Sequence, residues 1–478
     1  MMGDRVPAGL LTPEQIVEAG LAASRTDGCV VVVHSTSQAN ARWANNTVTT
    51  SGMATSVDFY VVAVVDTPSG RAAATVAGSS ADAASAVMVE AVVRAAEDAA
   101  RAASAGGAAR DAMALFGTGN SSGMESGFSD DAVPTSFDVF SGVLPSLAAA
   151  FDDARAGSRV LYGFARHEMR TVHLGTSTGL RRRWVQPTGT FELNAKSADL
   201  ARSAWTGAST VDFTDIDVAA AGLELSERLR WAERRVDLPP GRYDTVLPPT
   251  SVADFLIYLA WSAAARPAHE GRSAFASAGG TRSGERLTDR ALDLYGDPHA
   301  PGLECSPFVE TAHSSDEVSV FDNGTPAGRI ELVKGGVLHD LVHTRASAAE
   351  YGAAFTPVPD NLILTGGDET RSTADLVAGV ERGLLLTSLW YIREVDPMTL
   401  LLTGLTRDGV FLIEHGEVTA AVNNFRFNVS PFDVLRHSVD VGRTERCLSR
   451  EWSDFFTRSA MPAIRVDGFH MSSVSQAQ

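Results

Sequence analysis

The sequence predicts an α/β (α+β) protein of two domains: an N-terminal mixed sheet with long helices over residues 1–238, and a C-terminal β-rich, curled or barrel-like sheet with helices over residues 239–478. Two runs of β-branched residues, 30–33 and 57–65, have the composition of strands. A long alanine-rich segment with valines at helical spacing follows them. The segment 239–241, Pro-Pro-Gly, breaks both helices and strand ladders, so the chain is expected to divide there.

Capped helices and strands alternate in the N-terminal half. The segment 12–15, Thr-Pro-Glu-Gln, combines an N-cap, a proline at the first helical position and a capping glutamine, and it predicts the first helix. Ser79 or Ser80 is the expected cap of the alanine-rich helix, which runs to about Ala103. The Gly/Ser-rich residues 104–131 predict a mobile excursion without chemistry.

Further strands are expected around Val160, at 171–173 and at 188–194, and a helix over 217–235 closes the first domain. The isolated basic run 181–183 is expected at the solvated end of a strand. These elements complete a sheet with helices.

Composition and charge exclude some functions. The 478 residues are 44% hydrophobic and 21% charged, as in folded proteins with sizeable cores. A formal net charge of −18 and a pI near 5.0 repel phosphate backbones, so nucleic acid is not an expected partner. Lys196 and Lys334 are the only lysines, and with abundant alanine they indicate a GC-rich bacterial genome.

Three cysteines, Cys29, Cys305 and Cys447, are far apart and form no CxxC pair. Neither a disulfide framework nor a thiolate zinc site is indicated. The first residues lack the basic and apolar regions of a signal peptide. The longest apolar stretch, 255–265, is shorter than the roughly 20 residues that span a bilayer, so a cytoplasmic location and no membrane contact are expected.

The last third of the sequence is an ordered series of strand, turn and cap residues. Its members are Asp322-Asn323-Gly324 closing a strand, a strand after Arg329, Gly335-Gly336-Val337-Leu338, Asn361 to Leu364, Gly366-Gly367-Asp368, a helix capped by Ser372, Gly383 to Thr387, Gly404, Gly409, Ile413 to Glu417 and Asn424 to Asn428. This series resembles the carboxy-terminal half of the TldD/PmbA (TldD/TldE) family of cytosolic peptidase-like proteins. The first half resembles the family more loosely, through the strand and turn of Arg42 to Asn46.

The resemblance places a zinc motif, HExxxH, on the helix that follows Ser251 in the zinc-bearing members. The two histidines of this motif, five residues apart, bind zinc, and the glutamate activates the metal-bound water. Here the helix reads Asp-Phe-Leu-Ile-Tyr-Leu-Ala-Trp over 254–261, without histidine. The chain therefore resembles the zinc-less TldE/PmbA type, with no metal ligands and no catalytic residue of its own.

Two histidine patterns nearby imitate the missing motif. His269-Glu270 lacks a second histidine at helical spacing, and Pro267 interrupts a helix there. His339 and His343 are four apart and could bind a metal if their segment were helical. Within the resemblance, that segment is a variable polar stretch, which favours a surface or cavity-wall pair.

Two other patterns have alternative interpretations. Gly-Thr-Ser-Thr-Gly at 175–179 fits a nucleophile-elbow expression around Ser177, but a β-like run follows where a helix is required, which favours a hairpin turn. Cys447 lies where zinc-bearing members have a cysteine ligand, yet a lone cysteine is more often a small buried hydrophobe. The segment 399–402, Thr-Leu-Leu-Leu, replaces the family's Thr-Gly-Asp turn and puts the contact made by that turn in doubt.

The resemblance implies a non-catalytic subunit of a heterodimeric zinc metallopeptidase. A TldD-like partner would supply zinc and HExxxH, and this chain would supply cavity wall, with His269, Glu270 and Arg272 as candidate substrate-cavity contacts. The substrates would be unfolded or leader peptides, or an amide intermediate of natural-product biosynthesis. The alternatives are a structural or binding homo-oligomer without hydrolase activity, and an independent hydrolase that uses Ser177 or the His339/His343 pair.

Overall fold

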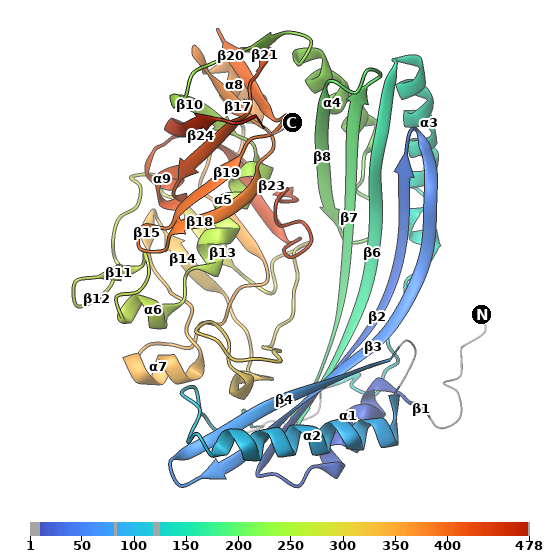
Figure 1. Cartoon of the computed structure of the whole chain (residues 1–478), viewed down its shortest axis with the longest axis vertical. Helices are drawn as coiled ribbons and strands as arrows, with labels where there is room; N and C mark the ends of the chain where they lie inside the picture. The colour runs from blue at the N-terminus through green and yellow to red at the C-terminus, as the bar shows by residue number, and fades with distance from the viewer. Residues whose placement is uncertain (1–9, 81–83, 118–124, 477–478) are drawn as a thin grey trace.

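The computed structural model describes residues 10–80, 84–117 and 125–476, which form two large sheets with helices packed on them (Figure 1). The N-terminal strands are β1 (Leu10–Leu11), β2 (Gly28–Ala44), β3 (Thr47–Thr67), β4 (Gly70–Ser80), β5 (Ala84–Ser85), β6 (Arg159–Thr176), β7 (Arg181–Ser197) and β8 (Ser203–Thr210). The N-terminal helices are α1 (Pro13–Ala23), α2 (Ala86–Ser104), the 3₁₀ helix η1 (Phe137–Phe140), α3 (Val143–Ala156) and α4 (Val218–Trp231).

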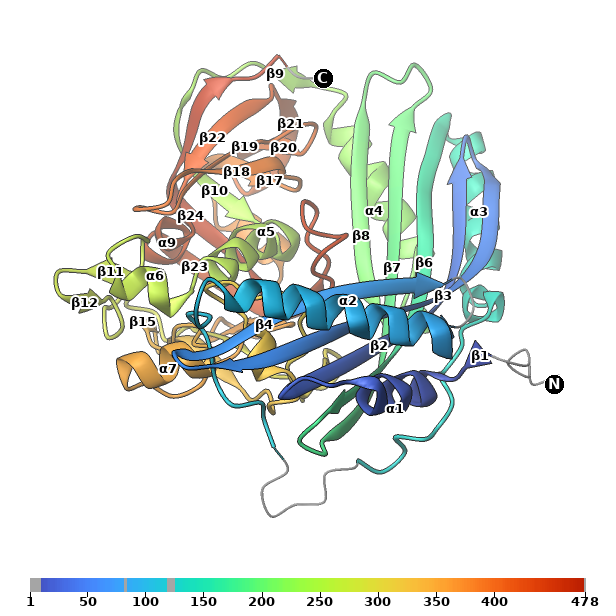
Figure 2. The same ribbon diagram turned by 60° about the horizontal axis from the view of Figure 1, so that its bottom comes forward.

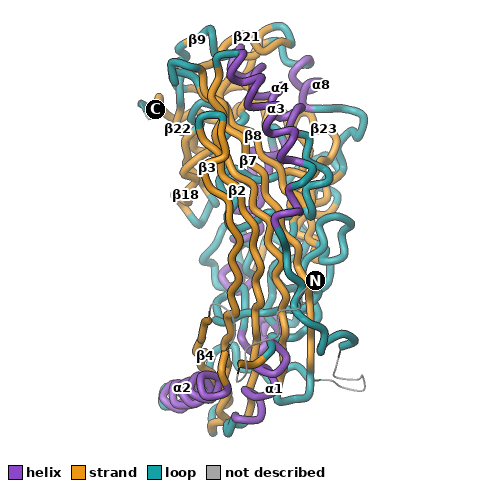
Figure 3. The backbone as a smooth tube through the Cα atoms, turned by 90° about the vertical axis from the view of Figure 1, so that its right-hand side faces the viewer, coloured by secondary structure: helices purple, strands orange, loops and turns teal. Residues whose placement is uncertain are grey.

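The N-terminal sheet has the order β4-β3-β2-β6-β7-β8, and every neighbouring pair is antiparallel. The expected mixed sheet is therefore wrong for this domain. Short turns join β2 to β3, β3 to β4, β6 to β7 and β7 to β8, whereas parallel neighbours would need long crossovers. Asn45 and Asn46, both with positive φ, make the two-residue turn between β2 and β3. Figure 3 shows the long strands running side by side.

Helices cover this sheet at both ends. α1 and α2 pack on its lower end, where they bury Val31, Val61 and Val93 among others (Figure 2). Thr12 caps α1 in a capping box with Gln15, as predicted. The predicted start of α2 at Ser79 or Ser80 is wrong: these residues continue β4 against β3, and Ser85 is the N-cap.

The C-terminal strands share one mixed sheet, apart from the short hairpin β11–β12. They are β9 (Arg235–Val236), β10 (Gly241–Leu247), β11 (Ala276–Ser277), β12 (Gly280–Thr281), β13 (Asp293–Gly296), β14 (Ile330–Lys334), β15 (Val337–Leu338), β16 (Leu362–Thr365), β17 (Arg382–Leu386), β18 (Trp390–Asp396), β19 (Leu401–Leu405), β20 (Val410–Glu414), β21 (Glu417–Val422), β22 (Phe425–Val429), β23 (Ser438–Cys447) and β24 (Ser459–Val474). The helices are α5 (Pro249–Trp261), α6 (Ala265–His269), the 3₁₀ helix η2 (Val320–Asp322), α7 (Arg345–Tyr351), α8 (Thr373–Ala378) and α9 (Pro431–Arg436).

This C-terminal sheet curls around a large apolar core. β10 lies between β17, to which it is parallel, and β24, to which it is antiparallel. The α+β class and the curled C-terminal sheet are confirmed, and over the described residues the strands do not close into a barrel. β9 joins this sheet just before the predicted boundary at 238/239, which stays a prediction.

The last third matches the expected series except at its start. Asp322 ends the 3₁₀ helix η2 and no strand, because Ser319 caps that turn and the Asn323 side chain donates to the carbonyls of Thr311 and Val320. The strands expected after Arg329 and around residue 363 form as β14 and β16, and Ser372 caps α8 in a capping box.

The side chain of Arg450 connects the two domains. Arg450, in the loop after β23, donates to Glu192 Oε2 of β7 at 2.9 Å, and Glu192 also accepts from Trp205 Nε1 of β8 at 2.8 Å. The guanidinium carbon of Arg450 lies 4.7 Å from the ring centroids of both Trp205 and Trp390. A cation between two indole rings is attracted to both of them.

No helix in the described ranges is long and apolar enough to cross a membrane.

Candidate functional site

Helix α5, where the resemblance places the zinc motif, lies inside the C-terminal domain. Pro249 lies in the first helical turn. Amides in that turn have no partner within the helix, so the missing amide hydrogen of proline costs nothing there. The helix is buried from Ser251 to Ile257 and packs against β23, β24 and α9. Its side chains fill the core, and none of them is a histidine.

The one carboxyl on α5 is that of Asp254, which is fully buried. Its Oδ1 accepts from the amide of Glu451 at 2.9 Å, and its Oδ2 has no hydrogen-bond partner. Burial raises the pKa of Asp254 well above its usual range. Burial therefore favours the neutral carboxyl, which is a weaker metal ligand than the carboxylate.

Cys447 lies beside the start of α5 and is buried, as expected for a small hydrophobe. Its Sγ is 3.5 Å from the carbonyl oxygen of Pro249 and 3.5 Å from Ser459 Oγ. Burial raises the pKa of Cys447 to about 12, so the group is a thiol, whereas zinc binds the thiolate. No three His, Cys, Asp or Glu side chains of the described residues are grouped to hold a metal ion. These residues do not fit the family's zinc.

The three predicted cavity contacts lie where the domains meet. His269 ends α6 and stacks on Tyr351, with ring centroids 3.9 Å apart. Glu270 accepts from Arg110 of the N-terminal domain and from Arg272 Nε at 2.8 Å. These two hydrogen bonds lower the pKa of Glu270 to about 2. The group is thus a charged contact between domains, and its role as a substrate contact stays a prediction.

His339 and His343 do not lie on one helix, because β15 ends at Leu338 and extended chain follows. His339 is exposed and contacts Asp340, while His343 is buried with Nδ1 3.2 Å from Ser347 Oγ. The structure instead places His343 beside His269, with ring centroids 6.0 Å apart. The sequence spacing therefore does not make the metal-binding pair that a helix would have made.

Ser177 lies in the tight turn between β6 and β7, as the hairpin interpretation predicts. Its Oγ accepts from the amide of Cys29 at 3.0 Å, and its own amide donates to the Cys29 carbonyl at 2.8 Å. The hydroxyl therefore fixes a turn and is not set up as a nucleophile.

We expect Ser177→Ala to leave any peptide hydrolysis by the assembled protein unchanged and to cost about 1 kcal/mol of stability through the lost hydrogen bond. Urea unfolding and a peptide-cleavage assay on the same preparation measure the two effects. Loss of an activity that the isolated chain has on its own would overturn this assignment and make Ser177 a nucleophile.

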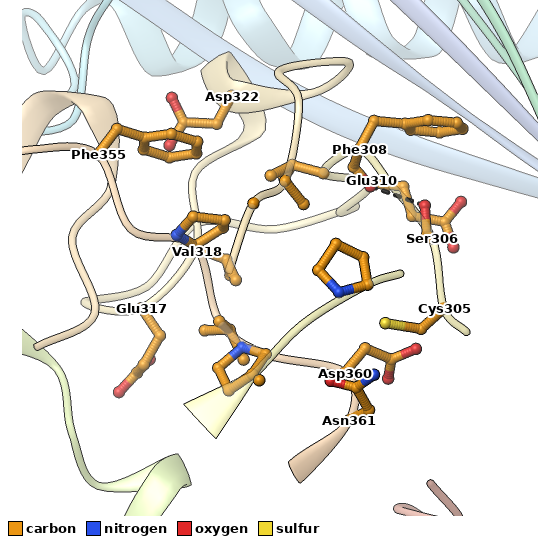
Figure 4. Close-up of a pocket in the computed structure, with 18 of the residues that line it drawn as sticks. Cys305, Ser306, Phe308, Glu310, Glu317, Val318, Asp322, Phe355, Asp360 and Asn361 are labelled. Atoms are coloured by element: carbon orange, nitrogen blue, oxygen red, sulfur yellow. Dashed lines mark hydrogen bonds between the residues drawn. The ribbon is translucent and has the colours of Figure 1, made fainter. Parts of the chain in front are cut away.

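A cavity of about 240 Å³ lies between the domains (Figure 4). Arg170 of β6 forms one wall, and loops of the C-terminal domain form the others. Phe308, Phe355 and Val318 make the lining partly apolar, while Glu310 adds a carboxylate. The cavity has room for one side chain of a peptide or a few waters.

A charged group in the wall of this cavity was not found from the sequence. His34 Nε2 is 3.0 Å from Glu310 Oε2, and Arg170 is 3.1 Å from Glu310 Oε1. Burial acts to raise the pKa of Glu310, but His34 and Arg170 outweigh it, so this pKa is lowered. The Tyr60 hydroxyl, buried near the same group, has no hydrogen-bond partner in the described residues. Because 276 residues separate His34 from Glu310, no local pattern could have paired them.

A larger space of about 770 Å³ opens between β8 and α4 on one side and the start of α5 on the other. Its walls include Trp205, Arg228, Thr250 and Cys447. This volume is within the range of ligand pockets, about 300–1,000 Å³. The space lies beside the start of α5, the helix on which the resemblance places the zinc motif.

The comparisons with known proteins agree with this architecture. Residues 240–473 match the PmbA/TldA metallopeptidase C-terminal domain. None of the curated proteins matches the sequence.

Three solved structures are similar over nearly the whole chain. TldE from Thermococcus kodakarensis has 16% identity and a TM-score of 0.74, and the match covers 96% of this chain and 99% of that one. A putative modulator of DNA gyrase from Bacteroides thetaiotaomicron has 15% identity and a TM-score of 0.72, covering 97% and 98%. A putative modulator of a DNA gyrase from Thermotoga maritima has 16% identity and a TM-score of 0.68, covering 93% and 95%.

The C-terminal match includes every strand from β10 to β23 and most of β24, in the order that the sequence predicted, and the fold similarity extends to the N-terminal sheet. From these findings together, residues 240–473 are a C-terminal domain of the PmbA/TldA metallopeptidase family, and the whole chain has the fold of the three solved structures.

Proposed function

We propose that this chain is a TldE/PmbA-like subunit without zinc of its own, which forms a heterodimer in the cytoplasm with a zinc-bearing TldD-like chain. The pair hydrolyses amide bonds of unfolded or leader peptides, or of an amide intermediate of natural-product biosynthesis. Zinc in the partner polarises the carbonyl and lowers the pKa of bound water. This chain contributes cavity wall and substrate selection.

The observation that carries the proposal is the state of α5 and Cys447. The helix that holds HExxxH in zinc-bearing members is packed into the core, and burial of its one carboxyl, Asp254, favours the neutral form. Cys447 is held as a thiol between Pro249 and Ser459. The similarity to the Thermococcus TldE supports the same assignment.

Zinc content and partner dependence test the proposal together. The chain purified alone from zinc-replete cells is expected to hold less than about a tenth of an equivalent of zinc. A structural zinc site needs about four protein ligands around the metal. Mixed with a TldD-like chain from the same genome, it is expected to elute as a heterodimer that holds zinc and cleaves an unfolded peptide.

Two results would contradict this. About one equivalent of zinc in the isolated chain, lost in Cys447→Ser or in His339→Ala with His343→Ala, would make it a metalloprotein in its own right. A stable homodimer that binds no TldD-like chain would favour the structural or binding homo-oligomer.

A further inference from the structure

One face of the N-terminal sheet is open. Along β6, Leu161 and Ala165 point to the core formed with α3 and α4, so Phe164 and Arg166 point the other way. The same alternation places Asn40 and Arg42 of β2 on this side. Figure 1 looks onto this face in its upper half, with α3 and α4 behind the strands and no other element drawn in front.

This open face, defined by Asn40, Arg42, Phe164, Arg166, Asn194 and Lys196, carries cations without carboxylate partners. The Arg42 guanidinium lies 6.0 Å from the centroid of the Phe164 ring, and Lys196 Nζ lies 5.9 Å from that of Tyr162. Within the described residues, none of the side chains of Arg42, Arg166 and Lys196 forms an ion pair or a hydrogen bond. This is unusual in a chain with 58 acidic and 40 basic side chains.

The carboxylates nearest in the strand register are already occupied. Glu168 Oε2 accepts from Gln38 Nε2 at 2.6 Å, and Glu192, opposite Phe164, accepts from Trp205 and Arg450. Neither is therefore the partner of the open cations. The face offers positive charge beside aromatic rings to a group from outside the chain.

We propose that this open face binds an acidic segment of an extended peptide. Arg166 pairs with Asn40, and Arg42 pairs with Phe164. The two pairs are two residues apart along the strands. From a strand rise of about 3.3 Å and a strand spacing of about 4.8 Å, the Cα atoms of Arg42 and Arg166 lie roughly 8 Å apart. Carboxylates at alternate positions of an extended peptide are about 7 Å apart and match this spacing.

Lys196 widens the site along the strands. It pairs in register with Val160, six residues before Arg166 on the neighbouring strand. By the same geometry it lies roughly 20 Å from Arg166, which is the length of about six extended residues. The peptide is thus held by its charges along a strand direction, with Phe164 and Tyr162 beneath it.

This inference rests on the proposed function, because the face can select a substrate only if it is part of the wall of a peptide-binding chamber. It narrows that class to peptides that contain an acidic segment. The binding itself is a property of the isolated chain, so its test does not depend on the zinc-bearing partner.

The probe is a fluorescein-labelled octapeptide with glutamate at alternate positions, compared with the same peptide carrying glutamine. We expect the intact chain to bind the glutamate peptide and to lose affinity as salt rises from about 50 to about 300 mM, since screening weakens exposed charge pairs. Arg42→Gln combined with Arg166→Gln is expected to weaken binding by about tenfold. Arg25→Gln with Arg382→Gln removes the same charge from exposed sites elsewhere and should change it less than about twofold.

The proposal fails if the glutamine peptide binds as well, or if both double variants weaken binding equally. It also fails if Arg42→Gln with Arg166→Gln abolishes pairing with the TldD-like chain and leaves peptide binding intact, because the face is then a subunit interface. Loss of zinc-dependent cleavage with normal peptide binding would overturn the proposed function and leave this site standing.

Discussion

Replacing Arg450 by alanine is expected to lower the free energy of unfolding by about 3 kcal/mol, the lower end of the range for removing one partner of a buried ion pair. The side chain of Glu192 is 5% exposed and that of Arg450 is 20% exposed, so little solvent screens their pair. Without the guanidinium, Glu192 keeps a single hydrogen bond, from Trp205, and its charge stays buried. The variant also loses both indole contacts, which join the N-terminal sheet to β18.

A double-mutant cycle separates these causes. Urea unfolding followed by tryptophan fluorescence measures Arg450→Ala, Glu192→Gln and the double variant, and we expect the double variant to recover part of the loss because no charge is left unpaired. Arg450→Lys should cost less than the alanine variant, since it keeps the charge and loses the planar stacking. Arg393→Ala, at a side chain that is 65% exposed, is the control. If the loss of stability in the double variant equals the sum of the losses in the two single variants, Arg450 and Glu192 act independently.

Local signals predicted the parts of the fold that depend on local chemistry. Thr12 with Gln15 marked the start of α1, and Asp217 marked that of α4, because cap residues bond to amides three positions away. The start of α2 was misplaced because Ser79 is as good a cap as Ser85, and only pairing with Asp58 across the sheet decides between them. The mixed N-terminal sheet was wrong for a similar reason, since strand direction depends on partners.

The candidate site divides in the same way. The absence of a zinc motif on α5 could be read directly from the residues, because a metal-binding pair on a helix is a matter of spacing. The contact of Cys447 with Pro249 and the pairing of Arg450 with Glu192 could not, since their partners are 198 and 258 residues away. The spacing of His339 and His343 would make a metal-binding pair only on a helix, and this segment is extended.

Acidification is expected to destabilise the chain through His173, by about 3 kcal/mol between pH 7 and pH 4. His173 lies on β6 with 1% exposure, against Phe128. Burial lowers the pKa of His173 to about 4, and the neighbouring charge of Arg183 acts in the same direction. The unfolded chain therefore takes up this proton near pH 6.5 while the folded chain resists it. The stability due to the neutral ring is complete above pH 6.5 and is lost as the pH falls to about 4.

His173→Gln tests this, because glutamine cannot titrate. At pH 7 the variant should be less stable than the intact chain by about 1 kcal/mol, through poorer packing on Phe128. Toward pH 4 the order should reverse, since only the intact chain loses the contribution of a buried neutral imidazole. The carboxylates titrate equally in both proteins, so their effects cancel in the difference between the two free energies of unfolding. His299→Gln, at an exposed position, should follow the intact chain at every pH. A difference between the His173 variant and the intact chain that stays constant from pH 7 to pH 4 would mean that His173 is protonated in the folded protein without cost.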